Sequence, residues 1–476
     1  MTSDSNYDNI SDSSNDSLLF SRLVHRHFRT NSLNKKFGGS GGYTTVEEPI
    51  SPASHGQVYT DWTGAAVPPA TLIDGWHKHL RRNLLGNPHS HHRPSAKAME
   101  DIKRTRAAIL DYFRAPHDEY EVIFTSGATS AIRLLEHYKF MGGEILLTAD
   151  NHNSVNGLRE TAKQSGAVVR YAPINGDLAI DADMLDRMLS FPRSNNQRLF
   201  AFPAKSNYAG TMHSLDWVRR AKSKGWDVLL DAAAFCANDR LDLGRVKPDF
   251  VPLSFYKMFG YPTGLGCLII RKDAYSRMHK KWFAGGSILI VSVMMDFYAP
   301  EVLGYARFED GTVNFGQIPA IIPGLQFLNS LGETKSHAVG LATVLYDRLA
   351  ELRAGRGSIL IHSARGNDTV TFSVKAGDKI INAWDFEKAA NERGVFVRSG
   401  CFCNPGVNEK VFGYEIETYA RLYNDAIMPD AITIEKLGEF SGGAPIGAIR
   451  ASFGYANTIV DVECFTAVTR DILNQL

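Results

Sequence analysis

The stretch from Ser254 to Gly266 constrains this chain more than any other. It reads Ser-Phe-Tyr-Lys-Met-Phe-Gly-Tyr-Pro-Thr-Gly-Leu-Gly, so a lysine stands three residues after a serine, at the end of an apolar run and before a glycine-rich turn. Lys257 is therefore well placed to form an imine with an aldehyde while the Ser254 hydroxyl holds a phosphate. Because a single lysine is more often a solvated surface charge, the rest of such a site must be found elsewhere in the sequence.

Pyridoxal 5′-phosphate is held by a lysine of this kind together with three further groups. Its phosphate needs an anion cradle, its ring nitrogen needs a facing carboxylate, and its ring needs a flat group packed against it. Candidates for all three stand upstream of Ser254.

Length and composition set the class of protein. With 476 residues, 44% hydrophobic and 22% charged, the chain can bury a large core and is expected to form two domains and a tail. Its 52 basic and 51 acidic residues nearly cancel, so nothing indicates a nucleic-acid surface, and no apolar run is long enough to cross a bilayer. Five cysteines form an odd and sparse set, which favours a reducing compartment, expected to be the cytoplasm, over a secreted disulfide framework.

The amino-terminal residues differ from the rest. Residues 1–17 are almost wholly Ser, Asn and Asp, and residues 38–42 read Gly-Gly-Ser-Gly-Gly, so residues 1–45 are expected to form a disordered arm. Residues 18–37 carry several Arg, Lys and His, which leaves a mitochondrial presequence as an alternative. The aspartates of residues 1–17 oppose that alternative, since such peptides are poor in acids.

A phosphate cradle is predicted after the strand at residues 120–125. Ser126-Gly-Ala-Thr129 follows this β-branched and aromatic run, and apolar residues then recur at helical spacing. A strand, a small-residue turn and a helix point free backbone N–H groups and a helix dipole at an anion. Ala128 and Thr129 are the candidates, although a turn of this composition is more often plain.

Strand and helix signals alternate through the middle of the chain, which predicts an α/β domain with a mainly parallel sheet flanked by helices. The predicted strands are residues 144–148, 167–171, 198–202, 227–230, 250–253 and 266–270. Ligands of such sheets collect at strand ends, where His152, Asn207 and Asp231 stand. Burying the Asp231 carboxylate among small apolar neighbours is unfavourable without a cationic partner, and a pyridinium N–H supplies one.

Two further segments complete the pattern. Asp61-Trp-Thr-Gly-Ala65-Ala follows a short strand, and its small residues allow the backbone near Ala65 to approach a ligand. The histidine-rich run at residues 87–93 is interpreted as a polar loop at the mouth of a site and not as a metal site, because no matching Cys or carboxylate set stands nearby. Residues 46–315 are thus predicted to form the large domain and residues 316–476 a smaller α+β domain.

Taken in this order, the motifs resemble those of class V aminotransferases of the fold-type-I pyridoxal phosphate superfamily, from about Tyr59 onward. Several stretches look most like the amino-terminal desulfurase domain of molybdenum cofactor sulfurases. They are Asp150-Asn-His-Asn-Ser-Val, Phe202-Pro-Ala-Lys-Ser-Asn207, Asp231-Ala-Ala-Ala-Phe, Ser254 to Gly266, Arg307-Phe-Glu-Asp-Gly-Thr312 and Val397-Arg-Ser-Gly-Cys-Phe-Cys-Asn-Pro-Gly406.

The resemblance implies a role for each candidate around the cofactor. Lys257 would bind it covalently and exchange protons with the substrate, a task shared with His152, which would also stack on the ring. Asp231 would face the ring nitrogen, and Asn207 would bond the ring hydroxyl.

The phosphate would be held by Ala128, Thr129 and Ser254. Thr312 would reach it from a second subunit, so a homodimer is expected.

The substrate, expected to be L-cysteine, would be bound by Asn207, by the turn at Ala65 and by Arg450. The planar fork of Arg450, which lies in the predicted small domain, would clamp the substrate carboxylate.

Cys403 is implied to be the sulfur acceptor, with Cys401 its closest competitor. Independently of the resemblance, the Gly-Cys-Phe-Cys-Asn-Pro-Gly segment is rich in turn formers, so a mobile loop near Arg398 is expected, where a thiolate would be exposed and favoured. Cys236 and Cys267 are interpreted as buried structural cysteines.

The predicted activity is release of sulfur from L-cysteine as a Cys403 persulfide, with alanine as co-product and with a protein or a small molecule as acceptor. The chain ends at Leu476 without the carboxy-terminal domain expected of full-length molybdenum cofactor sulfurases, so cofactor sulfuration is left open. The alternatives are a pyridoxal phosphate lyase or aminotransferase without a Cys403 relay, a serine acyl-transfer enzyme using Ser254 and Lys257, and a non-enzymatic scaffold.

Overall fold

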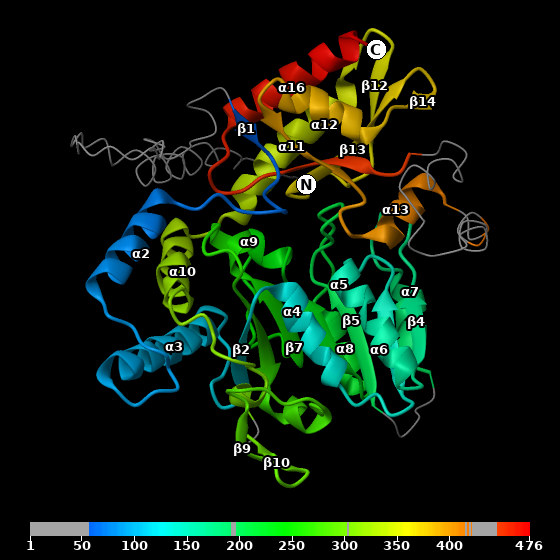
Figure 1. The fold of residues 1–476 in the computed structure, drawn as a ribbon. Coiled ribbons are helices and arrows are strands. Elements are labelled where there is room, and N and C mark those ends of the chain that lie inside the picture. The colour runs from blue at the N-terminus through cyan, green and yellow to red at the C-terminus, as the bar shows by residue number, and fades with distance from the viewer. Residues whose placement is uncertain (1–56, 192–196, 302–303, 415–416, 418–419, 421–444) are drawn as a thin grey trace, which may run out of the picture.

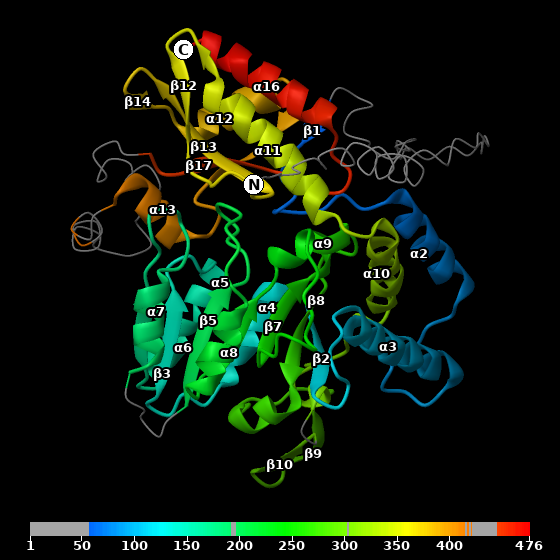
Figure 2. The same ribbon diagram turned by 180° about the vertical axis from the view of Figure 1, so that it is seen from behind.

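The computed structural model describes residues 57–191, 197–301, 304–414, 417, 420 and 445–476. The predicted amino-terminal arm lies outside these residues. Figures 1 and 2 show two layered parts, a large sheet with its helices and, beside it, a smaller sheet covered by α11, α12 and α16. No helix in the described part of the chain is long and apolar enough to cross a membrane.

The large part is built on a seven-stranded sheet. Its strands are parallel except β8, which runs antiparallel to both of its neighbours. In sheet order they are β2 (Tyr120–Thr125), β8 (Gly266–Arg271), β7 (Phe250–Ser254), β6 (Asp227–Asp231), β5 (Arg198–Pro203), β3 (Glu144–Thr148) and β4 (Val168–Ala172). The α/β architecture and the predicted strands are confirmed, with ends shifted by no more than one residue.

Helices cover both faces of this sheet because its strands are apolar on both sides. One face packs against α4 (Ala128–Arg133), α5 (Asn153–Asn156) and α6 (Leu158–Gln164). The other packs against α3 (Arg93–Tyr112), α7 (Ala182–Leu189), α8 (Asp216–Ser223) and α10 (Ile321–Leu331). Gly157, a residue that weakens helices, separates α5 from α6.

The smaller part is an antiparallel sheet. Its strands are β11 (Arg353–Ala354), β12 (Gly357–Ile361), β13 (Thr369–Ala376), β17 (Ala448–Ser452) and β16 (Arg398–Gly400), with β14 (Lys379–Ile380) beside β13. The apolar faces of α11 (Lys335–Glu351), α12 (Ala383–Asn391) and α16 (Ile459–Asn474) pack on it.

The amino-terminal strand joins the two parts of the molecule. β1 (Val58–Tyr59) pairs in parallel with β15 (Val395–Phe396), so the first described strand lies against the carboxy-terminal part of the chain. From there it passes through α2 (Ala70–Arg82) to the large sheet. The domain limits predicted at residues 46–315 and 316–476 remain a prediction.

Two segments extend this framework. A hairpin of β9 (Ile288–Ser292) and β10 (Phe297–Pro300) projects from the large part at the end opposite the smaller sheet (Figure 1). The short helices α9 (Phe255–Phe259) and α13 (Pro405–Phe412) lie between the two parts.

Candidate active site

A cavity lies at the carboxyl ends of the parallel strands, where the alternation of strands and helices predicts ligand binding. Seven of the predicted site residues line it: Ala128, Thr129, His152, Asn207, Asp231, Ser254 and Lys257. They come from segments that follow β2, β3, β5, β6 and β7. The fold therefore brings together side chains that are as far as 129 residues apart in the sequence, between Ala128 and Lys257.

Lys257 is placed by a short helix between two turns. Ser254 ends β7 and is the N-cap of α9, and Gly260 ends that helix with a left-handed φ of 79°. A Cβ on Gly260 would collide with Pro68, so only glycine allows the amino-terminal segment to cross here. These turns hold Lys257 at the cavity wall.

Backbone and hydroxyl groups come together around Ala128, where the sequence predicts a phosphate cradle. The Ala128 N–H donates to Ser254 Oγ at 2.8 Å, and the hydroxyls of Thr129 and Ser154 lie 2.8 Å apart. A Cβ on Gly266 would overlap the backbone of Gly127, so this glycine lets β8 pack against the turn. The result is a group of donors at the start of α4 beside the lysine.

Burial sets the charge state of the groups that face the cavity. It lowers the pKa of Lys257, and the neighbouring Asp231 carboxylate partly opposes that shift. Burial also lowers the pKa of His152, and the Asp231 carboxylate again opposes part of that shift. Both side chains therefore hold a proton less tightly than they would in water, which suits proton exchange near neutral pH.

His152 and Asp231 are each oriented by a backbone group. His152 is the N-cap of α5, and its Nδ1 accepts from the Ser154 N–H at 3.0 Å. One Asp231 oxygen accepts from the Ala233 N–H at 3.0 Å, and Asp231 forms no ion pair within the described residues. A buried carboxylate that lacks a cation is the group that a pyridinium N–H would satisfy.

Arg450 is bound by the chain itself. It lies on β17 and is 2% exposed. One terminal nitrogen donates to Asp61 Oδ1 at 2.6 Å, and the other donates to the Asn207 carbonyl at 2.7 Å. Its guanidinium also lies 4.7 Å from the centre of the Phe402 ring. Arg450 does not line the cavity, and a substrate carboxylate would have to share it with Asp61.

The cysteine loop, residues 401–404, connects β16 to α13. The backbone N–H of Asn153, next to His152, donates to the Cys403 carbonyl at 2.7 Å. Cys401 lies near Tyr208 and Tyr414. Burial raises the pKa of Tyr208, and the neighbouring Cys401 thiol raises it further. The two thiols thus have different surroundings, Cys403 next to the His152 segment and Cys401 beside tyrosines.

The loop is also bound more firmly than its composition suggests. The Asn207 side chain donates to the Phe402 carbonyl at 2.7 Å, and the Asn404 side chain is fully buried. The mobile segment expected from the turn-forming residues is therefore held, in this structure, by side chains that are distant in sequence.

Besides Arg450 and Cys403, two more predicted residues lie outside the cavity, Thr312 and Ala65. Thr312 accepts from the Asn87 side chain at 3.4 Å, and the Gly311 N–H donates to the Gly285 carbonyl, so this segment lies beside the loop that leads into β9. The Ala65 N–H donates to the Asp61 carbonyl at 3.1 Å within its own turn. The next residue, Ala66, donates to the Tyr256 carbonyl and ties this turn to α9.

Sequence motifs missed some contributors. Lys205 lines the cavity and pairs with the buried Asp368 at 2.5 Å. Asp61 was not predicted as the partner of Arg450. The signal for Lys205 was its place at the end of β5, two residues before Asn207, whereas no local pattern points to Asp61 or Asp368.

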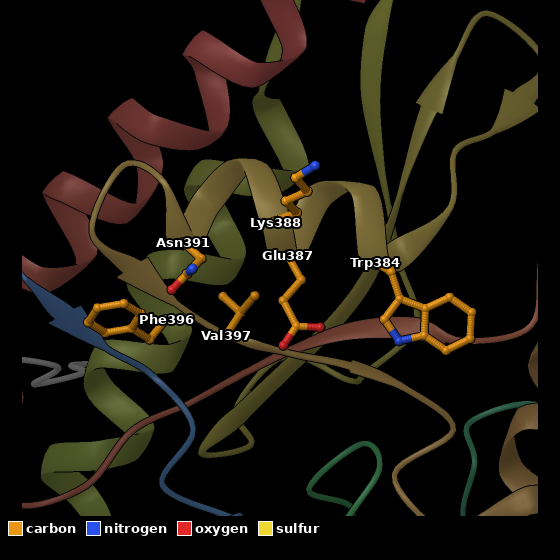
Figure 3. Close-up of a pocket in the computed structure, with 6 residues that line it drawn as sticks. All are labelled: Trp384, Glu387, Lys388, Asn391, Phe396 and Val397. Atoms are coloured by element: carbon orange, nitrogen blue, oxygen red, sulfur yellow. The ribbon is translucent and has the colours of Figure 1, made fainter.

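A second hollow lies under α12, away from these residues. It has a volume of about 530 Å³ and is lined by Trp384, Glu387, Lys388, Asn391, Phe396 and Val397. Figure 3 shows Trp384, Glu387 and Asn391 on α12 and the other two apolar residues on the neighbouring segment. No predicted site residue lines it, although it is larger than the strand-end cavity of about 100 Å³.

The cavity residues fit pyridoxal 5′-phosphate. A lysine with a lowered pKa, an unpaired buried carboxylate, an imidazole and a cradle of N–H and hydroxyl donors face one space. Each of these groups matches one part of that cofactor.

Comparison with known proteins gives the family. The chain matches the family model described as Aminotransferase class-V over residues 58–465. The molybdenum cofactor sulfurase of Danio rerio is 31% identical over 469 residues, which cover 90% of this chain and 56% of the relative. That of Arabidopsis thaliana is 33% identical over 461 residues, which cover 86% of this chain and 55% of the relative. The chain thus spans little more than half the length of these relatives.

Solved structures share the architecture at low sequence identity. A cysteine desulfurase from Thermococcus onnurineus NA1 in its apo form superposes with a TM-score of 0.72 at 20% identity, covering 89% of this chain and 96% of that one. The Escherichia coli cysteine desulfurase CsdA gives 0.70 at 20% identity, covering 90% and 97%. A C-DES mutant with glycine covalently linked to its PLP cofactor gives 0.66 at 17% identity, covering 88% and 98%.

The solved structures show that the chain has the fold of these proteins, the fold-type-I architecture. The chain belongs to the class V aminotransferase family. The resemblance inferred from the sequence motifs, including the likeness to molybdenum cofactor sulfurases, is confirmed.

Proposed function

We propose that this protein is a pyridoxal phosphate-dependent cysteine desulfurase, which converts L-cysteine to alanine and leaves the sulfur as a persulfide on Cys403. One observation carries the proposal. The cysteine loop is hydrogen-bonded to Asn153, the residue after His152, so a thiol-bearing loop adjoins a cavity that contains Lys257 and Asp231. A lyase or aminotransferase would need the cavity but not the loop.

The cofactor would be held by the residues that face it. Lys257 would bind it covalently, Asp231 would pair with its ring nitrogen, and His152 would lie against its ring. Ala128, Thr129 and Ser254 supply phosphate donors at the start of α4. When bound, pyridoxal 5′-phosphate supplies an electron sink that stabilises a carbanion at the substrate Cα.

The chain's own groups would then move the proton and the sulfur. Lys257 Nζ, deprotonated more easily because of its burial, would take the Cα proton. The Cys403 thiolate would attack the substrate sulfur, so an S–S bond forms as the C–S bond breaks and its electron pair stays on carbon. His152 or Lys257 would give a proton to that carbon, Cβ, and Lys257 would return the proton it took to Cα, which gives alanine.

The substrate carboxylate would be bound near Arg450 and Asn207. Both are fixed by contacts between the two parts of the molecule, since Arg450 on β17 donates to the Asn207 carbonyl after β5. The site would therefore be completed only when the smaller sheet is in place. Substrate binding would require Asp61 to share or release one side of the Arg450 fork.

The persulfide sulfur would pass to a protein or a small-molecule acceptor. The names of the curated relatives favour molybdenum cofactor as the final acceptor, but the chain covers only 56% and 55% of the two relatives compared. The sparse cysteines remain the reason for expecting a cytoplasmic location.

The decisive experiment incubates the purified, cofactor-loaded protein with L-cysteine. Equimolar alanine, together with a peptide containing Cys403 that is one sulfur atom heavier, would support the proposal. Pyruvate and ammonia would identify a lyase, and an oxo acid would identify an aminotransferase; either product without alanine would overturn the desulfurase assignment.

A homodimer is part of the proposal. The β9–β10 hairpin exposes a run of large apolar side chains, among them Val293 at 95% and Met294 at 90%, and an exposed apolar patch of this kind indicates an interface. Thr312, predicted to reach a partner's phosphate, lies at the base of the hairpin and not at its own cavity. The same surface would thus pair the subunits and deliver Thr312.

Sedimentation with a matched pair of variants tests this. Val293→Lys should yield a monomer that binds cofactor more weakly, because charge is placed in the interface. Val460→Lys changes an exposed apolar residue on α16 and should leave the dimer intact. A wild-type monomer that is active at nanomolar concentration would contradict the proposal.

A further inference from the structure

The cysteine loop contains two adjacent residues in a conformation that side chains disfavour. Phe402 and Cys403 both have φ of 55°, in the left-handed region, and neither is glycine. A backbone conformation of this kind persists only where contacts with the surrounding structure hold it in place. The contacts that do so identify the groups responsible for placing the Cys403 thiol.

The backbone carbonyls of Phe402 and Cys403 flank the Cys403 Cα, and both accept hydrogen bonds from the large part of the molecule. The Phe402 carbonyl accepts from the side chain of Asn207, a cavity residue, at 2.7 Å. The Cys403 carbonyl accepts from the Asn153 N–H, also at 2.7 Å. With both carbonyls held, the direction of the Cys403 side chain is set by groups of the cavity and of the His152 segment.

Asn404 is the residue that binds these groups together. Its side chain is fully buried, and Nδ2 donates both to the Asp150 carbonyl at 2.8 Å and to Asn207 Oδ1 at 3.0 Å. Its Oδ1 accepts from the Val407 N–H at 3.3 Å as the N-cap of α13. An amide alone combines these donors with that acceptor, so neither Asp nor Ser can replace it fully.

We infer that Asn404 is a positioning residue for sulfur transfer, which holds Cys403 in a fixed place beside the cavity by bonding Asp150 and Asn207. This inference rests on the proposed desulfurase function. It replaces the expected mobile loop with a rigid one. The thiol would then attack from a preset position, and a small displacement would lower the rate of sulfur transfer without affecting cofactor binding.

The test compares two Asn404 variants with a neighbouring control. Asn404→Ser and Asn404→Asp both keep an acceptor that caps α13 but lose the Nδ2 donors. Asn408→Asp alters another buried asparagine one helical turn later, whose amide bonds Ile446 and Tyr208 and not the cysteine loop. Using two variants keeps the test valid if one of them folds poorly.

Three readouts are measured on holoenzyme: the cofactor absorption spectrum, kcat and KM for alanine formation from L-cysteine, and the alkylation rates of Cys403 and Cys401 with iodoacetamide by peptide mass spectrometry. We expect both Asn404 variants to keep the spectrum and to lower kcat by about 100-fold, with a much smaller change in KM because Asn404 also bonds Asn207. The ratio of Cys403 to Cys401 alkylation should change several-fold, and Asn408→Asp should change neither quantity.

Wild-type kcat and an unchanged alkylation ratio in both Asn404 variants would overturn the inference while leaving the desulfurase proposal intact. If the wild type makes no alanine, the proposed function fails, and the alkylation ratio alone decides whether Asn404 positions the thiol. An equal change in Asn408→Asp would show a general effect of packing on α13 and would also overturn the inference.

Discussion

The cavity and the cysteine loop adjoin one another but differ in whether their buried polar groups have partners within the chain. In the cavity, Asp231 forms no ion pair among the described residues, and burial lowers the pKa of Lys257 and His152. In the loop, the carbonyls of Phe402 and Cys403 are bonded to groups that lie far away in the sequence. The cavity thus holds a buried carboxylate with no ion pair, whereas both of these loop carbonyls have partners within the folded chain.

This difference predicts how each region responds to change. A buried charge without a partner destabilises the folded chain, so cofactor binding should stabilise the protein through the cavity. The loop already has its bonds and should not depend on the cofactor. Substitutions in the cavity should therefore affect cofactor binding first, and substitutions in the loop should affect sulfur transfer alone.

The largest effect is expected for Lys257→Ala. Without this amine the cavity has no group to bind the cofactor covalently or to take the substrate proton, so alanine formation should fall on the order of 1,000-fold or more. Borohydride treatment followed by peptide mass spectrometry should find no adduct in the variant. An adduct on another lysine, with activity retained, would show that the cavity is not organised around Lys257.

The next effect separates the two regions directly. Cys403→Ala should keep the cofactor spectrum and its response to L-cysteine, yet lose alanine formation on the order of 100-fold, because the proposed sulfur acceptor would be missing. Cys401→Ala should retain activity, since that thiol lies near Tyr208 and Tyr414. The reverse result would assign the acceptor to Cys401, and no effect of either change would favour a lyase or aminotransferase.

A stability experiment examines the ion pair that lies between the large and small sheets. Lys205 lines the cavity and Asp368 precedes β13, and both side chains are buried. Asp368→Ala would leave Lys205 buried without a partner and should lower the free energy of unfolding by about 3–5 kcal/mol in urea titrations. Asp347→Ala removes an exposed partner of Arg365 and should change little; equal effects would refute a special role for the buried pair.

The same pair has a defined pH dependence. Burial alone would raise the pKa of Asp368, but Lys205 and three hydrogen bonds lower it below the ordinary value. A carboxyl with a lowered folded-state pKa stabilises the protein above its unfolded-state pKa, near 4, and loses that contribution as the pH falls through the folded-state value.

The sequence predicted most of the cavity because its residues follow a strong local pattern. Several parallel strands are apolar runs that end at a polar residue, as at Asp231 and Ser254, and the alternation with helices places those ends at one edge. Seven of the fourteen residues that line the cavity were named from such positions. The β9–β10 hairpin was missed, since its apolar residues have no buried partner to impose a regular alternation.

The contacts around the loop and Arg450 could not be predicted in this way. The pairs Arg450 with Asp61, Asn404 with Asp150 and Lys205 with Asp368 are separated by 389, 254 and 163 residues. They depend on how the small sheet packs against the large one, which no local pattern specifies. The sequence could not show these contacts of the loop, since its turn-forming residues bond to partners that only the tertiary fold supplies.

The smallest predicted effect is a shift in the pH dependence of cofactor loading, which reports the pKa of Lys257 in the cavity. Only a neutral amine forms an imine, so the loading rate should rise with pH and level off above the pKa of Lys257. Burial lowers that pKa, which places the inflection below the ordinary lysine value of 10.5, and Asp231 raises it in part. Asp231→Asn should therefore move the inflection to still lower pH. The control is Asp239→Asn, which changes a carboxylate that pairs with Lys335 and should leave the inflection in place.

The unfolded chain binds the Lys257 proton more tightly than the folded chain, so the stability of the cofactor-free protein should also rise with pH between the two pKa values. Borohydride trapping at fixed times gives the loading rate, and an inflection at or above 10.5 in the wild type would show that Lys257 is solvated and that the cavity does not act on it as described.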